Sequence, residues 1–589
     1  MEQHRLALAA LAAVSALAAS APAAHAAERN AVVEGVDDRA LRSALERAIG
    51  DARAPVENRL AARQRARDAA DSAMALLRSE GYYAAKAEPY IGEGERPTPT
   101  VQIQLGPRFV VADPKVEWVG GEPSADAVAA ATKSLGLAAG APGRAADVLA
   151  AEGRLVAAVE QHGYADAAAQ PRQVVVDHAD HTVRPTFRIA AGGAVRLDGV
   201  RLPAKGRTHP DWVAQLAPWK PGELYRPELV AELERRLLDT QVYDQVTVSL
   251  APADQTTPQG ERPVIVSLAD RSSRTLDLSA GYGSNEGADV DLRWSLFNRL
   301  GRADTLAFEA RTAEIGSRLG VDLSLPHWLH PDRTLKLTAE GFHDTLPAYD
   351  QTGGALRVDL THRYGRIAYF TRGLSLVKTS VYDKHTGTMN LEALKGLLAF
   401  SLDRSNDPLN PTRGWRAEGR VEPTLVTGSH GLLYTTSQAQ VSAYLPFDSE
   451  GATVLAGRVR LGSVIGGRLA SVPAFDRLYS GGGGSVRGYS YQSIGPRYAD
   501  GVPQGGLSLF ESSAELRHNF GVIGGVAFVD DGSVSQKVNP DFRDVRFAVG
   551  LGLRYNLPFA PLRLDIARPL HRPKGDAPFQ LYVSIGQAF

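Results

Sequence analysis

The stretch Gly481-Gly482-Gly483-Gly484-Ser485-Val486-Arg487-Gly488-Tyr489 decides how this chain is interpreted. Its arginine lies between glycines, late in a long run of segments that alternate polar and apolar residues. If that run spans a membrane, a guanidinium buried there is costly unless a carboxylate neutralises it. A candidate partner follows in Phe528-Val529-Asp530-Asp531-Gly532. The two segments together predict a loop arginine that pairs with a carboxylate on a strand.

From about Ser272 the apolar pattern has a period of two. Leu276, Leu278, Ala280 and Tyr282 alternate with Thr275, Asp277 and Ser279, and the same alternation recurs in several later segments, the last running from Phe547 to Tyr555. Successive side chains of a strand point to opposite faces. The pattern therefore predicts half-buried antiparallel strands.

Alternation alone does not separate a soluble sheet from a membrane barrel, because either can have one apolar face. Three features favour the barrel. The segments are long enough to span a bilayer, aromatic residues fall near their ends, and the chain closes with Phe579, Leu581, Val583, Ile585 and Phe589 on one expected face. At roughly twenty residues per strand and loop, the 318 residues from 272 to 589 fit about sixteen strands.

The first 26 residues have the pattern of a secretory signal peptide. His4 and Arg5 precede an apolar stretch from Leu6 to Ala19, and Ala24-His25-Ala26 is a small-x-small cleavage site. No later stretch has the ~18 consecutive apolar residues of a transmembrane helix. A net charge of −1 gives no indication of a nucleic-acid partner, and the lack of cysteine excludes disulfides and cysteine metal sites.

Residues 27 to about 271 mix helices and strands, and a junction recurs in them. It reads Glu80-Gly81-Tyr82-Tyr83, then His162-Gly163-Tyr164-Ala165, then Gln241-Val242-Tyr243-Asp244. Positions 81, 163 and 242 are 82 and 79 residues apart, which indicates an array of similar units; three unrelated junctions are the alternative. Glycine suits the left-handed end of a helix, and the tyrosine is expected to start a strand. Val242 departs from this pattern.

One strand of this region, from Thr182 to Ile189, contains Pro185. Proline cannot donate a hydrogen bond to a neighbouring strand. We therefore expect the strand at 182–189 to lie at the edge of its sheet.

The glycine-rich segment and the Phe-x-Asp-x-Gly segment, in this order, resemble the signature of the outer-membrane assembly-factor superfamily, which includes BamA, TamA and the two-partner secretion transporters. The β-α-α-β-β repeats look like the periplasmic POTRA domains of that superfamily. The resemblance implies a signal peptide at 1–26, POTRA domains at 27–106, 107–191 and 192–271, and an outer-membrane β-barrel at 272–589.

The resemblance also implies roles for single residues. The segment from Val486 to Tyr489 would be the tip of an extracellular loop that folds back into the lumen, where Arg487 pairs with Asp530 on the inner wall. We call Val486, Arg487, Gly488, Tyr489 and Asp530 the loop lock; Phe528 and Gly532 complete the wall motif. The alternative is an exposed, flexible loop with a solvated arginine. Alternation places Asp531 on the opposite face of its strand.

A barrel that inserts other strands needs a weak seam between its first and last strands, where an open edge can template an incoming strand. The expected seam positions are Thr275, Asp277 and Ser279 on the first strand and Ser584, Gly586 and Phe589 on the last. Gly586 weakens the last strand, because glycine has no side chain to pack.

No enzyme or metal constellation is found in the sequence, and no cofactor is expected. The stretch from Asp403 to Gly414 resembles another superfamily motif and predicts a rigid turn, because proline fixes φ while Asn and Asp bond locally. His327 and His330 flank a turn with Pro326 and Pro331 and are expected at an interface loop rather than on a metal.

Three POTRA-like units are similar to the TamA family, against five in typical BamA and two in the two-partner transporters. The resemblance implies a non-enzymatic insertase for autotransporters and other β-barrel proteins, with outer-membrane lipid around it and a TamB-like periplasm-spanning protein as partner. A two-partner-type secretion pore and a passive porin are the alternatives.

Overall fold

The computed structural model describes residues 29–52, 55–92, 97–283, 287–428, 431–557, 561–572 and 577–589. The expected signal peptide lies outside these residues. The chain forms two compact units. One contains the first two α+β sheets together with residues 219–229 and 251–263, and the other contains residues 199–218, 230–250 and 264–589, which include the barrel.

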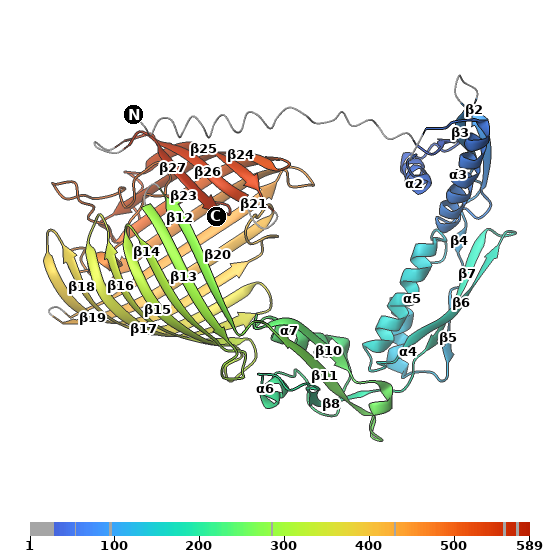
Figure 1. The fold of residues 1–589 in the computed structure, drawn as a ribbon, viewed down its shortest axis with the longest axis horizontal. Coiled ribbons are helices and arrows are strands. Elements are labelled where there is room, and N and C mark those ends of the chain that lie inside the picture. The colour runs from blue at the N-terminus through green and yellow to red at the C-terminus, as the bar shows by residue number, and fades with distance from the viewer. Residues whose placement is uncertain are drawn as a thin grey trace. The chain divides into compact units, whose positions relative to one another are not determined.

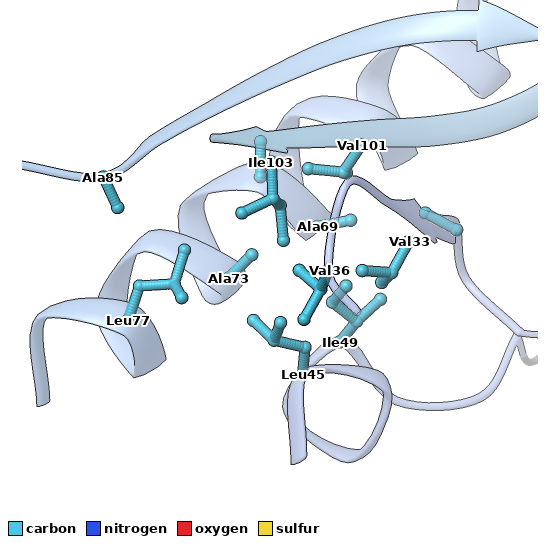
Figure 2. Close-up of a cluster of buried hydrophobic side chains, with 12 residues drawn as sticks. Val33, Val36, Leu45, Ile49, Ala69, Ala73, Leu77, Ala85, Val101 and Ile103 are labelled. Carbon is cyan, nitrogen blue, oxygen red and sulfur yellow. The ribbon is translucent and has the colours of Figure 1, made fainter. Parts of the chain in front are cut away.

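The first sheet has the strand order β1-β3-β2, with bounds Val32–Glu34, Thr98–Gln104 and Lys86–Gly92. Helices α2 (Arg39–Ile49) and α3 (Arg59–Ser79) begin after Asp38 and Asn58, whose side chains accept hydrogen bonds from the first-turn amides. Figure 2 shows the apolar faces of both helices packed against the strands, with Leu45, Leu77, Val101 and Ile103 in the buried core.

The second sheet contains β4 (Val110–Val111), β5 (Lys115–Val119), β6 (Ala168–Asp177) and β7 (Thr182–Ala190), with helices α4 (Ala125–Ser134) and α5 (Ala145–Glu160). The expected edge position of the strand at 182–189 is wrong, because β7 is central. It pairs with β6 along one edge and with β4 and β5 along the other. Pro185 falls between the residues that pair with β4 and those that pair with β5, so its missing amide hydrogen breaks no bond to either of these two strands.

The third sheet has the order β10-β11-β8-β9, with bounds Tyr243–Leu250, Glu261–Asp270, Arg196–Arg201 and Glu223–Leu224. Helices α6 (Pro210–Gln215) and α7 (Pro227–Leu238) accompany it, and a 3-10 turn covers Ala253–Gln255. This α+β region resembles POTRA domains, while the domain bounds given above stay predictions. Within the described ranges, none of the helices is long and apolar enough to cross a membrane.

The recurring junction has the expected glycine conformation in two units. Gly81 and Gly163 have φ angles of 94° and 99°, a left-handed conformation that glycine adopts without strain. In the third unit Gln241, at φ 59°, takes this place rather than Val242. The expected strand start is wrong for the first two tyrosines, since β2 begins at Lys86 and β6 at Ala168. Backbone turns, such as the bond from Ala167 N to the carbonyl of Tyr164, come between.

Residues from Arg274 onward form a closed barrel of sixteen strands, β12 to β27, which confirms the expected fold class. Neighbouring strands are antiparallel, and Figure 1 shows them in colours from green to red. Their bounds are Arg274–Gly283, Gly287–Phe297, Thr305–Ala313, Gly316–Leu325, Arg333–Thr345, Asp350–Tyr364, Ala368–Asp383, Gly387–Asp403, Gly414–Gly428, Leu432–Pro446, Thr453–Ile465, Ser508–Phe520, Ile523–Ser535, Arg546–Asn556, Pro561–Pro569 and Gln580–Ile585.

The barrel strands have one open apolar face and one polar face. On β12, 66% of the surface of Leu276 and 72% of that of Leu278 is exposed, and Leu551 on β25 is 65% exposed. The opposite faces carry charged residues such as Arg554 and Asp565, which are buried. Leucines exposed on the outside of a closed barrel match a lipid-facing surface, so the alternation belongs to a membrane barrel rather than a soluble sheet.

Helix α7 contacts the barrel at the rim where β12 begins, which we call the entry rim. Asp239, just after α7, forms an ion pair of 2.6 Å with Arg363 at the end of β17. Arg235 of α7 pairs at 3.1 Å with Asp332 in the turn between β15 and β16. His327 of the same turn bonds through Nε2 to the carbonyl of Arg236 at 2.9 Å. Helix α7 is thus joined to two places on the entry rim.

Candidate functional site

Residues 466–507 connect β22 to β23 and fold into the barrel. Isolated bridges between Leu478 and Gly506 and between Ser480 and Ile494 shape this loop. Val486, Tyr489 and Ile494 form a buried cluster with Ala548, which lies on β25. The tip of the loop is therefore inside the lumen, packed against the barrel wall.

Arg487 is the central residue of this site and is 2% exposed. Its backbone amide and its Nε donate to Oδ2 of Asp530 at 3.0 and 2.7 Å, and Nη2 donates to Oδ1 at 2.9 Å. A planar guanidinium meets both carboxylate oxygens in this geometry, which gives the pair a defined direction as well as attraction.

Three residues of β24 face inward in this motif, and each of them makes a different contact with the loop. The ring of Phe528 lies under the guanidinium, with 3.4 Å between its centroid and Cζ of Arg487, a cation–π contact. Asp530 neutralises the charge. Gly532 leaves room for Val486, because a Cβ at position 532 would lie 2.8 Å from its Cγ2. Asp531 lies on the opposite face and accepts a hydrogen bond from the hydroxyl of Ser512.

Two further carboxylates that the sequence analysis missed also reach Arg487. Its Nη1 lies 2.7 Å from Oε1 of Glu515 on β23 and 2.8 Å from Oδ2 of Asp565 on β26. Glu515 pairs in turn with Arg517, and Asp565 with Arg554. The sequence pattern could have indicated that these four charged residues face inward, because each stands at a polar position of a strand with period-two alternation. Arg487 therefore belongs to a buried charge network rather than to a single pair.

A second group of contacts holds the glycine run. Glu511 on β23 is fully buried and accepts hydrogen bonds from the hydroxyls of Ser480, at 2.8 Å, and Ser485. Arg458 on β22 donates to the carbonyls of Gly484 and Ser485 at 3.2 and 2.6 Å. The loop is thus bound to β22 and β23 independently of Arg487.

The seam between β12 and β27 is weakly paired. Within the described parts of the two strands, a single register pair joins them, Gly283 with Tyr582. By contrast, β12 pairs with β13 along its whole length. Thr275, Asp277 and Ser279 lie on the part of β12 that has no described partner from β27, and Ser584 pairs with Arg563 of β26. The β12 edge is therefore open towards the entry rim.

The last residues of the chain do not continue the lipid-facing row of β27, so that expectation for Phe589 is wrong. β27 ends at Ile585, and Gly586, with a φ angle of 90°, turns the chain inward. Its amide donates to the carbonyl of Pro561, and Gln587 donates from Nε2 to Oδ1 of Asn410 at 3.0 Å. Phe589 packs on a buried lumen cluster made by Tyr444, Val454 and Ala456.

The stretch from Asp403 to Gly414 is a rigid turn between β19 and β20, as predicted. Oδ1 of Asp407 accepts hydrogen bonds from the amides of Leu409 and Asn410, both at 2.7 Å. Gly414 has a φ angle of 99° where β20 begins. In the histidine turn, His327 contacts α7 through the carbonyl of Arg236. No cluster of three or more potential metal ligands occurs among the residues that the structure describes.

Residues 298–589 match the family described as the Omp85 superfamily domain. The barrel therefore carries the Omp85 signature that the two motifs predict. The chain is 23% identical over 430 residues to the outer membrane protein assembly factor BamA of Neorickettsia risticii, covering 68% of this chain and 56% of the relative. It is 22% identical over 391 residues to BamA of Neisseria meningitidis serogroup B, covering 60% and 47%. The chain thus spans about half the length of these relatives.

The fold is also similar to a solved structure. The crystal structure of BamA from Haemophilus ducreyi lacking POTRA domains 1–3 aligns with a TM-score of 0.68 and 18% identity, over 81% of this chain and 100% of that one. The protein is an outer-membrane β-barrel protein, with its POTRA-like region in the periplasm. The entry rim is accordingly the periplasmic rim.

Proposed function

We propose that this protein is an outer-membrane assembly factor of the TamA type, which helps autotransporters and other β-barrel proteins into the outer membrane. It acts by strand templating and not as an enzyme. Its partners are unfolded outer-membrane protein clients, the surrounding lipid and a TamB-like periplasm-spanning protein.

The open edge of β12 is the observation that carries this proposal. From Thr275 to Ser279 its backbone groups face no described partner from β27. An exposed edge pairs readily with another strand, and β-augmentation aligns an incoming segment through main-chain hydrogen bonds. A client strand that enters from the periplasm meets this edge at the entry rim.

Two other features support the assignment to the TamA family within the superfamily. Among the described residues, three α+β sheets with their helices precede the barrel, the number of POTRA domains that the resemblance implies for the TamA family. The tip of the loop and the turned-in residue Phe589 also pack inside the lumen, an arrangement that argues against a passive porin.

Reconstitution tests the proposal. The purified protein in lipid vesicles should accelerate the insertion of an unfolded autotransporter barrel over empty vesicles, and it should show little steady ion conductance. Native purification from membranes should recover a TamB-like protein. Insertion no faster than in empty vesicles, together with steady conductance, would favour the two-partner secretion pore instead.

A further inference from the structure

Tyr582 belongs both to the seam and to the surroundings of the loop lock. It is the residue of β27 that pairs with Gly283 of β12. Its side chain is 5% exposed and lies in a buried cluster with Val526, Phe528 and Ala567. Its hydroxyl accepts a hydrogen bond from the amide of Gly488 at 3.0 Å. The loop and the seam strand are therefore joined at one side chain.

Glycines let the loop approach this tyrosine closely. A Cβ at position 483 would lie 2.9 Å from Cδ1 of Tyr582, closer than real Cβ contacts come. Gly488 has a φ angle of 94°, and a Cβ there would lie 3.0 Å from the Cβ of Ala548. Phe528, which lies under the guanidinium of Arg487, belongs to the same cluster as Tyr582. Contacts therefore run without a gap from Arg487 to the seam strand.

Three other attachments of the loop lie on strands other than β27. Arg458 is on β22, Glu511 on β23 and Asp530 on β24. Beyond these, Gln580 of β27 donates from Nε2 to the hydroxyl of Ser490 at 3.3 Å. The seated loop thus connects a firmly paired part of the wall with β27, which is weakly paired with β12.

We propose that Tyr582 is a positioning residue that couples the seated loop to the pairing of β27 with β12. This proposal rests on the proposed function, in which the seam opens for a client. While the loop is seated, the Gly488 amide holds the phenol and keeps β27 in register at Gly283. When the loop leaves, the phenol loses that donor and the seam pair is released.

A cysteine pair next to the seam reports this coupling. Gly281→Cys with Ser584→Cys continues the register of Gly283 and Tyr582 by two residues, and the chain has no native cysteine. Adding Tyr582→Phe removes the hydroxyl and keeps the ring. Because the loss of one neutral hydrogen bond shifts an equilibrium by roughly fivefold, disulfide formation under mild oxidation should fall about fivefold.

Tyr434→Phe is the matched control. It also removes a buried hydroxyl that binds this loop, at Asp476, but from β21. It should leave disulfide formation unchanged. Equal disulfide formation in the Tyr582→Phe and parent proteins, or an equal fall in the control, would overturn the proposal.

A pair of glycine variants provides a second measurement. Gly483→Ala forces a methyl group against the Tyr582 ring and should lower disulfide formation in the same direction. Gly484→Ala is the control, because nothing lies within 4 Å of a Cβ there. Equal disulfide formation in the two alanine variants contradicts the coupling. These measurements need no client, so a failed insertion assay with intact coupling counts only against the proposed function.

Discussion

The backbone amide and the side chain of Arg487 bind the same carboxylate, that of Asp530, at 3.0 and 2.7 Å through its Oδ2 atom. The contact therefore fixes the main chain of the loop as well as its charge. The guanidinium reaches Glu515 and Asp565 from the same position. A residue that replaces Arg487 must satisfy all three carboxylates at once.

Arg487→Lys should therefore behave more like Arg487→Ala than like the parent protein. A lysine keeps the charge but is a single point without the planar fork. Losing a buried pairing of this kind costs about 3–5 kcal/mol, so external proteinase K should cut the loop at least about tenfold faster. Heated and unheated samples should still migrate differently in a detergent gel, because the barrel still assembles. Arg468→Lys, an exposed change in the same loop, should stay protected, and equal protection of Arg487→Lys would contradict the argument.

The charge network also changes the expected result of a charge swap. From the sequence alone, Arg487→Asp with Asp530→Arg is expected to recover part of the activity lost in either single variant. In the structure, an aspartate at 487 faces Glu515 and Asp565, so three carboxylates would meet in a dry site. We now expect no recovery of client insertion in the double variant. Recovery to half the parent rate or more would show that the pair with Asp530 acts alone.

The residues that the sequence predicted and those that it missed differ in kind. Period-two alternation has a simple physical cause in the strand, so the strands were predictable, and the length of this part of the chain predicted about sixteen of them. The partner Asp530 came from a motif that is local in sequence. Glu515 and Asp565 could not be assigned, because which inward charges meet depends on strand register and on how far the loop descends. The inward turn at Gly586 depends on a single φ angle, which alternation does not report.

The contact between α7 and the entry rim should weaken in acid. Burial lowers the pKa of His327 below its ordinary value of 6.5, so the ring is neutral at neutral pH. Its Nδ1 accepts from the amide of Asp332 at 3.1 Å, and protonation removes that acceptor. The pKa of His327 is lower when α7 is docked on the entry rim. The contribution of His327 to the stability of this contact is therefore complete above about pH 6.5 and is lost as the pH falls through the lowered pKa.

A spin label on α7 can measure this change. Attached at the exposed position Ala231, it should become more mobile between about pH 7.5 and about pH 5. His327→Gln retains a donor and an acceptor but does not titrate, so it should remove the pH dependence. The same mobility change in His327→Gln would assign the effect to another group.

A disulfide across the seam should block client insertion. If β27 continued the register of Gly283 with Tyr582 past Ile585, Ser279 would lie opposite Gly586, so Ser279→Cys with Gly586→Cys is the in-register choice among the seam positions. Asp277→Cys with Ser584→Cys is out of register and is the control. A disulfide needs Cα atoms within about 7 Å, so bonding traps β27 along the open edge of β12. Oxidation should stop insertion and a reductant should restore it. A barrel that is fully disulfide-bonded, yet inserts clients as fast as the same protein with its cysteines reduced, would refute strand templating at this seam.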